Sequence, residues 1–371
     1  MALLALKKTK KEVRRTDLAS SRQIMWWNFK KHRLALVGST LISIYIFISI
    51  FAEFIAPTLP HSRNTRYTEG APTIIHIYDD GGLHLPFIYK TIKKRDRVTL
   101  RSISSVDTSV RWPVELFVQG ESYRLFDLFQ SNIHLFGTKN GFIHLFGTDK
   151  IGRDVFSRAI YATRISMSIG IIGVFVAFLL GLIMGGIAGY MGGFVDDIIM
   201  RLIEFIRSIP TLPLWLGLAA ALPREWSSLQ VYVVVTLILA CIGWTQLARR
   251  VRSKLLSLRN VDFVLAARLS GCSNARIVGK HMLPSFMSYM IVDLTVAFPY
   301  IILAETTLSF LGLGLREPIV SWGILLYSAQ NIRSIAHMPW LLIPGLFLII
   351  IVVAFNFFGD GLRDAADPFT E

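Results

Sequence analysis

Residues 261–284 read VDFVLAARLSGCSNARIVGKHMLP and lie between two long apolar segments. The stretch predicts two short helices joined by a glycine turn. Asn260 can cap the first helix, and Gly271 can adopt the left-handed backbone conformation that ends it. Ser273 can cap the second helix, and Pro284 would end the stretch where the next apolar segment begins. An ordinary cytosolic helical hairpin has the same pattern, so the flanking segments decide what this stretch is.

The composition and the placement of charge indicate a membrane protein. Of the 371 residues, 53% are hydrophobic, and the mean hydropathy of +0.52 is too high for a soluble domain of this size. The formal net charge is +14, with ten Lys and Arg in residues 1–33 and eight more in residues 249–280. Both clusters flank apolar segments. They therefore follow the positive-inside rule, place both regions in the cytoplasm and require no nucleic acid as a partner.

Six segments are apolar enough to span a bilayer, whose hydrocarbon core of about 30 Å needs roughly 20 helical residues. They comprise residues 34–56, 165–190, 202–222, 231–247, 285–311 and 341–358. The first is too long for a signal-peptide core and no small-residue cleavage site follows it, so we expect an uncleaved membrane helix. The second contains six glycines, which let helices pack closely in lipid, and the third is interrupted by Pro210 and Pro213.

Residues 57–150 differ in composition from the rest and would lie outside the cytoplasm. Residues 74–85 read as a β-hairpin with its turn at Asp79-Asp80-Gly81-Gly82, and residues 114–118 read as a strand followed by a turn at Gln119-Gly120. We therefore expect a small β-containing insertion between the first and second membrane helices. The spacing of its histidines matches no metal-ligand pattern, so we interpret them as solvated or structural: His61, His76, His84, His134 and His144.

The predicted fold is an all-α polytopic membrane protein with six transmembrane helices, both termini in the cytoplasm and this extracytoplasmic insertion. The chain divides into a basic cytoplasmic N-terminus (1–33), the first transmembrane helix (34–56), the insertion (57–150) and a five-helix core (151–371) with a cytoplasmic loop at 249–284. Its two cysteines, Cys241 and Cys272, offer neither a disulfide framework nor a CxxC metal site.

The stretch at 261–284 resembles the loop by which the membrane subunits of ABC importers dock onto their ATPase. The family pattern is Glu-Ala-Ala, a glycine four residues after the second alanine, nine further residues, and then an apolar residue, any residue and Leu-Pro. Leu265 replaces the family glutamate, and His281 replaces the apolar residue. The positions that correspond to the pattern, and that the resemblance assigns to ATPase coupling, are Leu265, Ala266, Ala267, Gly271, His281, Leu283 and Pro284.

Other segments resemble permeases of the oligopeptide/dipeptide/nickel branch of ABC importers. Residues 146–154 (FGTDKIGRD) resemble the stretch before their second span, and residues 305–314 (ETTLSFLGLG) with Ser321-Trp322-Gly323 resemble the end of their fifth span. Residues 355–364 (FNFFGDGLRD) resemble their C-terminus, and residues 27–57 resemble their first span. The resemblance implies the C-type permease subunit of a binding-protein-dependent importer.

This resemblance also implies partners in the bacterial inner membrane: a second homologous permease subunit, two ATP-binding subunits and a periplasmic solute-binding protein. Peptides are the leading solute class, with opines, nickel chelates or oligosaccharides as alternatives. The sequence contains no G-x-x-x-x-G-K-[ST] phosphate loop. We therefore expect the partner subunits to bind and hydrolyse ATP, and we expect no catalytic residue, cofactor or metal in this chain.

Two other classes of membrane protein compete with this interpretation. A stand-alone channel or ion-coupled secondary transporter is the main alternative, but it should show inverted repeats of spans, and we find no convincing repeat. A membrane-embedded enzyme is disfavoured because the sequence contains neither HExxH nor G-x-S-x-G.

Charged residues at two further places are candidates for function. Glu305 lies in an apolar span, where a charge is costly, and is either a pathway or gate residue or a group that pairs locally near the outer headgroups. Asp293 lies earlier in the same span, where the family is usually apolar. Asp149, Arg153 and Asp154 either contact the solute-delivery protein or fix the helix that enters the second span through local ion pairs.

Overall fold

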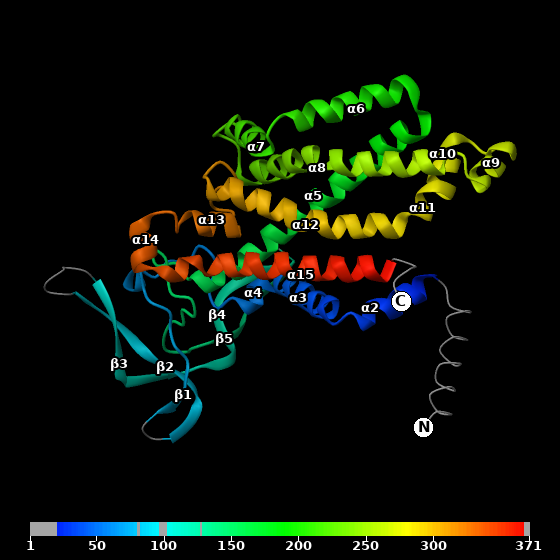
Figure 1. Cartoon of the computed structure of the whole chain (residues 1–371). Coiled ribbons are helices and arrows are strands. Elements are labelled where there is room, and N and C mark those ends of the chain that lie inside the picture. Colours follow the sequence, from blue (N-terminus) through cyan, green and yellow to red (C-terminus); the bar gives the residue numbers. More distant parts are fainter. Residues whose placement is uncertain (1–20, 80–81, 96–101, 127, 367–371) are drawn as a thin grey trace, which may run out of the picture.

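The computed structural model of the chain describes residues 21–79, 82–95, 102–126 and 128–366. Most of the predicted basic N-terminus and the centre of the predicted turn at Asp79-Asp80-Gly81-Gly82 lie outside the described residues. The described part is a bundle of long helices with a small group of strands at one end (Figure 1). Helix α2 (Ser21–Lys31) lies at the opposite end of the bundle from these strands.

Within the described residues, five helices are long and apolar enough to cross a membrane, or up to six spans if a bent pair forms one. The five are α3 (Arg33–Ile50), α5 (Val155–Met191), α8 (Ser228–Leu258), α12 (Met287–Phe310) and Pro339–Ala366, which joins η3 (Pro339–Leu342) to α15 (Ile343–Ala366). The bent pair is α6 (Gly193–Ser208) and α7 (Thr211–Ala220), which meet at 84°. Pro210 lies at the break between them, so the predicted interruption of the third segment is confirmed.

Two helices are longer than the apolar segments that predict them. α5 begins at Val155 rather than Ile165, and α8 continues to Leu258 rather than ending at Leu247. At about 1.5 Å per residue, α5 is roughly 55 Å long, well beyond a hydrocarbon core of about 30 Å. Hydropathy detects only the lipid-embedded part of a helix. The basic residues 249–254 therefore belong to the last turns of α8, and the loop that follows is shorter than predicted.

The first predicted span is divided at Phe51 into α3 and the single-turn helix α4 (Ala52–Ile55). The guanidinium of Arg164 on α5 reaches this break. It donates to the carbonyl oxygen of Ser49 at 2.7 Å and pairs with the carboxylate of Glu53. The arginine thereby satisfies a carbonyl at the end of α3 and holds the break against α5.

Glycines let α5 approach its neighbours closely. Gly181, Gly185 and Gly189 face α8, and a β-carbon on any of them would lie 2.5–2.9 Å from atoms of α8. Two others face α12 in the same way. Gly186 faces open space, so the predicted packing role is confirmed for the other five: Gly170, Gly173, Gly181, Gly185 and Gly189.

The strands of the described ranges form two small antiparallel sheets. One holds β1 (His76–Asp79), β2 (Gly82–Arg95) and β3 (Ser102–Pro113); the other pairs β4 (Glu115–Leu125) with β5 (Phe129–Gly137). Pairing of β1 with β2 confirms the predicted hairpin. The predicted turn at Gln119-Gly120 is wrong, because both residues lie within β4 where its register is irregular. Gly120 is required there because the ring of His134 would lie 2.6 Å from an added β-carbon.

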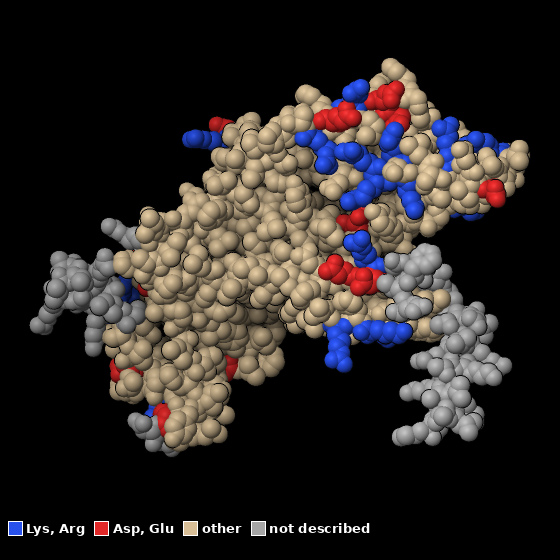
Figure 2. Space-filling view, viewed as in Figure 1, with Lys and Arg blue, Asp and Glu red and all other residues tan. Residues whose placement is uncertain are grey.

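The two ends of the bundle carry different features. Near the strands lie α13 (Trp322–Tyr327) and α14 (Ile332–His337) (Figure 1). The other end of the bundle carries α2, the end of α15 and three short helices: α9 (Asp262–Leu269), α10 (Asn274–Arg276) and α11 (Leu283–Ser285) (Figure 1). Lys and Arg side chains gather over this second end, while the middle of the bundle shows little charge on the same face (Figure 2). This distribution is the one that the positive-inside rule describes.

Candidate functional sites: a helical loop, a charged cavity and an ion-pair cluster

The loop at 261–284 turns sharply at Gly271, as predicted. Gly271 has a φ of +76°, in the left-handed region that favours glycine. α9 ends in a Schellman motif, in which the N–H of Cys272 donates to the carbonyl oxygen of Ala267 at 3.1 Å. The N–H of Gly271 donates to the carbonyl oxygen of Arg268 at 3.0 Å. The turn is therefore fixed by backbone hydrogen bonds and by one residue with an unusual conformation.

The predicted side-chain caps of the loop do not form in the described structure. Val261, and not Asn260, is the N-cap residue of α9, and its side chain cannot accept a hydrogen bond. Ser273 occupies the N-cap of α10, but its hydroxyl makes no cap bond. The carboxylate of Asp262 lies in the first turn of α9 and complements the positive end of the helix through its charge alone.

The second half of the loop is not a single α-helix. One turn of α10 leads into a π-helical segment, η2 (Ile277–Met282), then into α11 and, after a break at Phe286, into α12. Pro284 lies in the first turn of α11, where its missing N–H would interrupt a regular helix; we attribute the wider turn to it. Pro284 therefore lies inside this helical connection, and the span itself begins at Met287.

One face of the loop packs against the bundle and the other is exposed. The buried face joins Val251 and Leu255 of α8 in one apolar cluster through Val264, Ala267, Ile277 and Met282. The exposed face carries apolar side chains beside cations: Phe263, Leu265 and Leu269, with Arg268, Arg276 and Lys280. Leu269 is 90% exposed. An exposed apolar patch rimmed by charge is typical of a protein–protein interface.

The positions that match the coupling pattern are divided between these faces. Ala267 is buried, His281 and Leu283 are half-buried, and the remaining four are exposed: Leu265, Ala266, Gly271 and Pro284. Leu265 extends the exposed apolar patch at the position where the family has a glutamate.

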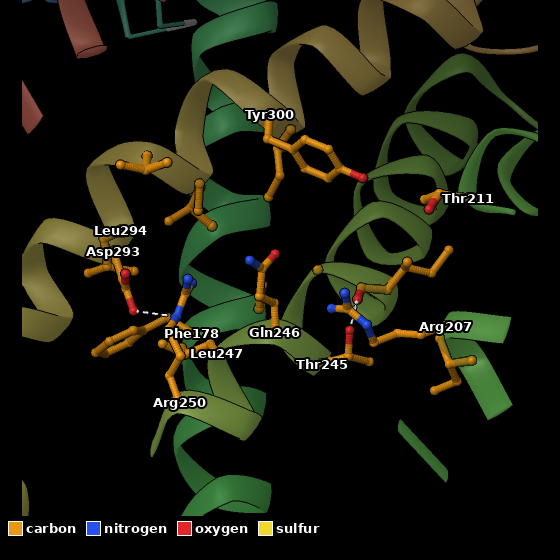
Figure 3. A pocket seen from close by; sticks show the side chains of 18 residues that line it. Phe178, Arg207, Thr211, Thr245, Gln246, Leu247, Arg250, Asp293, Leu294 and Tyr300 are labelled. Carbon is orange, nitrogen blue, oxygen red and sulfur yellow. Dashed lines mark hydrogen bonds and ion pairs between the residues drawn. The ribbon is translucent and has the colours of Figure 1, made fainter. Parts of the chain in front are cut away.

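A cavity of about 310 Å³ lies among α5, α8, α12 and the bend between α6 and α7. Most of its wall is apolar, and seven polar side chains line the rest: Arg207, Thr211, Thr245, Gln246, Arg250, Asp293 and Tyr300. The bend at 208–211 brings Arg207 and Thr211 to one side of the cavity, across from Arg250 and Asp293 (Figure 3). Gln246 lies between the two sides (Figure 3).

An ion pair explains the acidic residue in the apolar α12. Arg250 Nε lies 2.7 Å from Asp293 Oδ2, and the two side chains are 37% and 13% exposed. A charge in a membrane segment is tolerated when it has a partner or faces a cavity, and Asp293 has both. Within the described ranges, Arg207 forms no ion pair with a carboxylate.

Asp149, Arg153, Arg158 and Glu317 form a compact ion-pair cluster at the start of α5. Asp149 Oδ2 lies 2.7 Å from Arg153 Nε and 2.9 Å from Arg158 Nη1. Glu317 Oε1 lies 2.7 Å from Arg153 Nη1 and 2.8 Å from Arg158 Nη2. The Arg158 side chain is 2% exposed, whereas Glu317 is 47% exposed. The cluster ties residues 146–154 to the loop that follows α12.

This cluster lowers the pKa of Glu317. Burial alone would raise that pKa, but the charges of Arg158 and Arg153 and their hydrogen bonds outweigh burial and lower it below 4.5. A carboxyl group whose pKa is lower in the folded than in the unfolded state stabilises the fold at neutral pH. That contribution is lost as the pH falls through the folded-state pKa.

Asp154 caps α5. Its Oδ2 accepts a hydrogen bond from the N–H of Ser157 at 2.7 Å, and its Oδ1 lies 3.1 Å from Nδ1 of His144. Asp149, Arg153 and Asp154 are all buried. The local ion pairs that the sequence analysis offered as one alternative are present, while contact with a delivery protein stays a prediction that this burial disfavours.

Glu305 is buried at the end of α12. One carboxylate oxygen accepts hydrogen bonds from the hydroxyls of Ser309 at 2.7 Å and Ser321 at 2.8 Å. Ser321 is the N-cap residue of α13, so Glu305 joins two helices. It is not among the residues that line the cavity. Local pairing is therefore present, and a role as a gate stays a prediction.

The histidines of the insertion that are buried serve the fold. Nδ1 of His134 lies 2.5 Å from the carbonyl oxygen of Ala56, and its Nε2 lies 3.0 Å from that of Glu121. His144 contacts Asp154, as described above. Over the part of the chain that the structure describes, no group of three or more His, Cys, Asp or Glu could hold a metal ion.

Three charged residues of these sites were missed by the sequence analysis. Arg158 and Arg207 lie in or beside apolar segments, where an isolated cation is itself a signal. Glu317 gave no such signal, because its partner Arg158 lies 159 residues away in the sequence.

Two family models match the chain. Residues 150–371 match the model described as binding-protein-dependent transport system inner membrane component, and residues 20–72 match the N-terminal TM domain of oligopeptide transport permease C. The first covers the core helices and the helical loop, and the second covers α2, α3 and α4.

Similar proteins that are described as peptide-transport permeases agree with these family matches. The dipeptide transport system permease protein DppC of Bacillus subtilis is 40% identical over 221 residues, 60% of this chain and 67% of the relative. DppC of Lactococcus lactis is 31% identical over 353 residues, 93% of this chain and 90% of the relative, so this alignment includes most of the region of strands. The MetNI methionine ABC transporter aligns with a TM-score of 0.44 and 18% identity, over 57% of this chain and 97% of that one, too distant to add to the assignment. The chain belongs to the inner membrane components of binding-protein-dependent ABC importers, in the oligopeptide and dipeptide branch.

Proposed function

We propose that this permease imports peptides and works with a second homologous permease subunit, two ATP-binding subunits and a periplasmic binding protein. Substrate and partners rest on relatives that are named dipeptide and oligopeptide permeases. The observation that carries the coupling role is the helical loop at 261–284, with its fixed turn and its exposed patch of apolar and basic side chains.

The contacts of the loop support a mechanical role. Its buried face packs on α8, and the hydroxyl of Tyr190, at the end of α5, donates to Asn274 Oδ1 at 2.7 Å. The loop also continues through η2 and α11 into α12. An ATPase that pulls on the exposed patch would therefore move α5, α8 and α12 together. These three helices line the cavity, so the movement would change access to it.

The proposed topology has six spans, with α6 and α7 as one broken span, both termini and the loop at 261–284 in the cytoplasm, and the strands outside. The gathering of Lys and Arg at one end of the bundle supports this orientation (Figure 2). It places the Arg153–Asp149 cluster at the outer end of the bundle.

Labelling from one side of the membrane tests this topology. Single-cysteine variants at Thr108 and Ser253, both exposed, would be made in a background without Cys241 and Cys272. An impermeant thiol reagent added to spheroplasts should label Thr108→Cys and not Ser253→Cys. Both should be labelled after the membrane is permeabilised, which controls for intrinsic reactivity. Labelling of Ser253→Cys alone before permeabilisation would reverse the orientation.

Peptide uptake tests the proposed substrate class. Cells that lack this gene should lose ATP-dependent accumulation of a radiolabelled tripeptide and regain it when the wild-type chain is expressed. Uptake of a free amino acid provides the control for general damage to the membrane. Unchanged tripeptide uptake in a strain without other peptide importers would show that peptides are not the substrate.

A further inference from the structure

The cavity among α5, α8, α12 and the α6–α7 bend holds an unequal set of charges. Two arginines and one aspartate line it, and Arg250 is paired with Asp293 at 2.7 Å. Arg207 is left without a carboxylate partner among the described residues and faces the same space from the opposite side (Figure 3). Among the described residues, the cavity therefore presents one cation without an ion-pair partner, Arg207, whose side chain is exposed beside a mostly apolar wall.

The neighbours of Arg207 favour one type of ligand group. Gln246 lies between Arg207 and the Arg250–Asp293 pair (Figure 3), and Tyr300 lines the cavity from α12; both side chains can donate hydrogen bonds. A guanidinium binds a planar carboxylate through two parallel hydrogen bonds, a geometry that is stronger and more specific than a single contact. Arg207, Gln246 and Tyr300 are all exposed in this chain and therefore accessible to such a ligand. The volume of about 310 Å³ lies at the lower end of the range for small-molecule sites, roughly 300–1,000 Å³.

We propose that this cavity is a solute site that recognises a free carboxylate, with Arg207 as the group that binds it and Gln246 as an additional donor. The proposal rests on the proposed function, because it places the solute inside the permease. Asp293 acts differently, because it pairs with Arg250 and so, within the part of the chain that the structure describes, leaves the cavity with one unpaired cation rather than two. The remaining apolar wall, which includes Phe178 and Leu294, accommodates the rest of the solute.

Two variants should change binding in opposite directions. Arg207→Gln removes the free cation and should weaken binding of a carboxylate solute about tenfold, while Arg207→Lys keeps the charge and should have a smaller effect. Asp293→Asn releases the charge of Arg250 and should tighten binding. Arg201→Gln is the matched control, because Arg201 lies on the same helix in an exposed ion pair with Glu204.

Direct binding to the whole complex provides the measurement. The permease pair with its ATPases is placed in lipid nanodiscs without binding protein, and calorimetry measures the Kd for trialanine and for trialanine amide. The wild type and Arg201→Gln should bind trialanine at least tenfold more tightly than its amide, and Arg207→Gln should bind both equally weakly. Equal affinities in the wild type, no detectable trialanine binding, or unchanged discrimination in Arg207→Gln would each overturn the proposal.

A parallel uptake assay separates this proposal from the proposed function. If wild-type proteoliposomes with binding protein and ATP accumulate trialanine but the Arg207 variants bind it normally, the importer stands and the carboxylate site is wrong. If wild-type proteoliposomes accumulate no peptide, the proposed peptide function is wrong, whatever the calorimetry shows.

Discussion

Gly271→Asp should abolish peptide uptake while the permease stays inserted and folded. Open space surrounds Gly271: among the described residues no heavy atom lies within 4 Å of an added β-carbon, so an aspartate β-carbon would cause no clash there. The φ of +76° costs an L-residue about 1–2 kcal/mol, and aspartate tolerates that conformation better than most. The fold should therefore survive, and the new carboxylate would project from the loop.

The expected loss of peptide uptake follows from the charge of the surface on which the new carboxylate would lie. The exposed face of the loop carries the cations Arg268, Arg276 and Lys280. The complementary groove of an ATPase would be acidic, and like charges brought together across an interface cost several kcal/mol. Uptake by reconstituted complexes, ATPase pull-down and solute-stimulated ATP hydrolysis should all fall to background.

Two controls separate docking from backbone strain. Gly193 also has a positive φ, +55°, and open space around it, but it lies at the start of α6, outside the loop. Gly193→Asp should therefore transport within about twofold of the wild type. Gly271→Ala keeps the strain without the charge and should retain most of the uptake. If Gly271→Asp at normal abundance transports like the wild type, the loop does not transmit the movement of the ATPase.

The sequence predicts the turn at Gly271 well because its information is local. A glycine such as Gly271 can end a helix because it adopts a positive φ without a partner elsewhere in the chain. Pro210 likewise breaks a span through its own missing N–H, whatever its neighbours are. The caps were predicted less well. Asn260 is a favourable capping residue, but α9 begins after Val261, since burial of Val264 and Ala267 against α8 sets the phase of the helix.

Charged sites depend on partners that are distant in the sequence, and prediction was weakest there. Asp293 had no explanation until the fold placed Arg250 beside it, and the extension of α8 beyond its apolar segment is what places Arg250 there. Glu317 likewise meets Arg158 only through tertiary structure. Neither hydropathy nor motif spacing can indicate the Arg250–Asp293 pair or the Arg158–Glu317 pair. The buried cluster is therefore where mutation is most informative.

Arg158→Met should strongly destabilise the fold through that cluster. Methionine keeps the length and apolar stem of the side chain but leaves Asp149, which is 7% exposed, with Arg153 as its remaining ion-pair partner among the described residues. Removal of one partner from a buried ion pair costs about 3–5 kcal/mol. Because Arg153 still contacts both carboxylates and Glu317 is half-exposed, we expect the lower part of that range, about 3 kcal/mol.

The measurement is the thermal unfolding temperature of the purified permease complex, with membrane abundance as a second readout. Arg158→Met should lower both, while Arg201→Met, which removes an ion pair that is 84% and 56% exposed, should change neither. The difference in unfolding temperature between wild type and variant should also shrink in acid. Protonation of Glu317 below its depressed pKa weakens its pairing with Arg158 in the wild type as well. A wild-type unfolding temperature for Arg158→Met at neutral pH would mean that the cluster does not hold the loop after α12 against α5. In that case the burial of Arg158 between two carboxylates would have to serve contacts made in another conformation of the transport cycle.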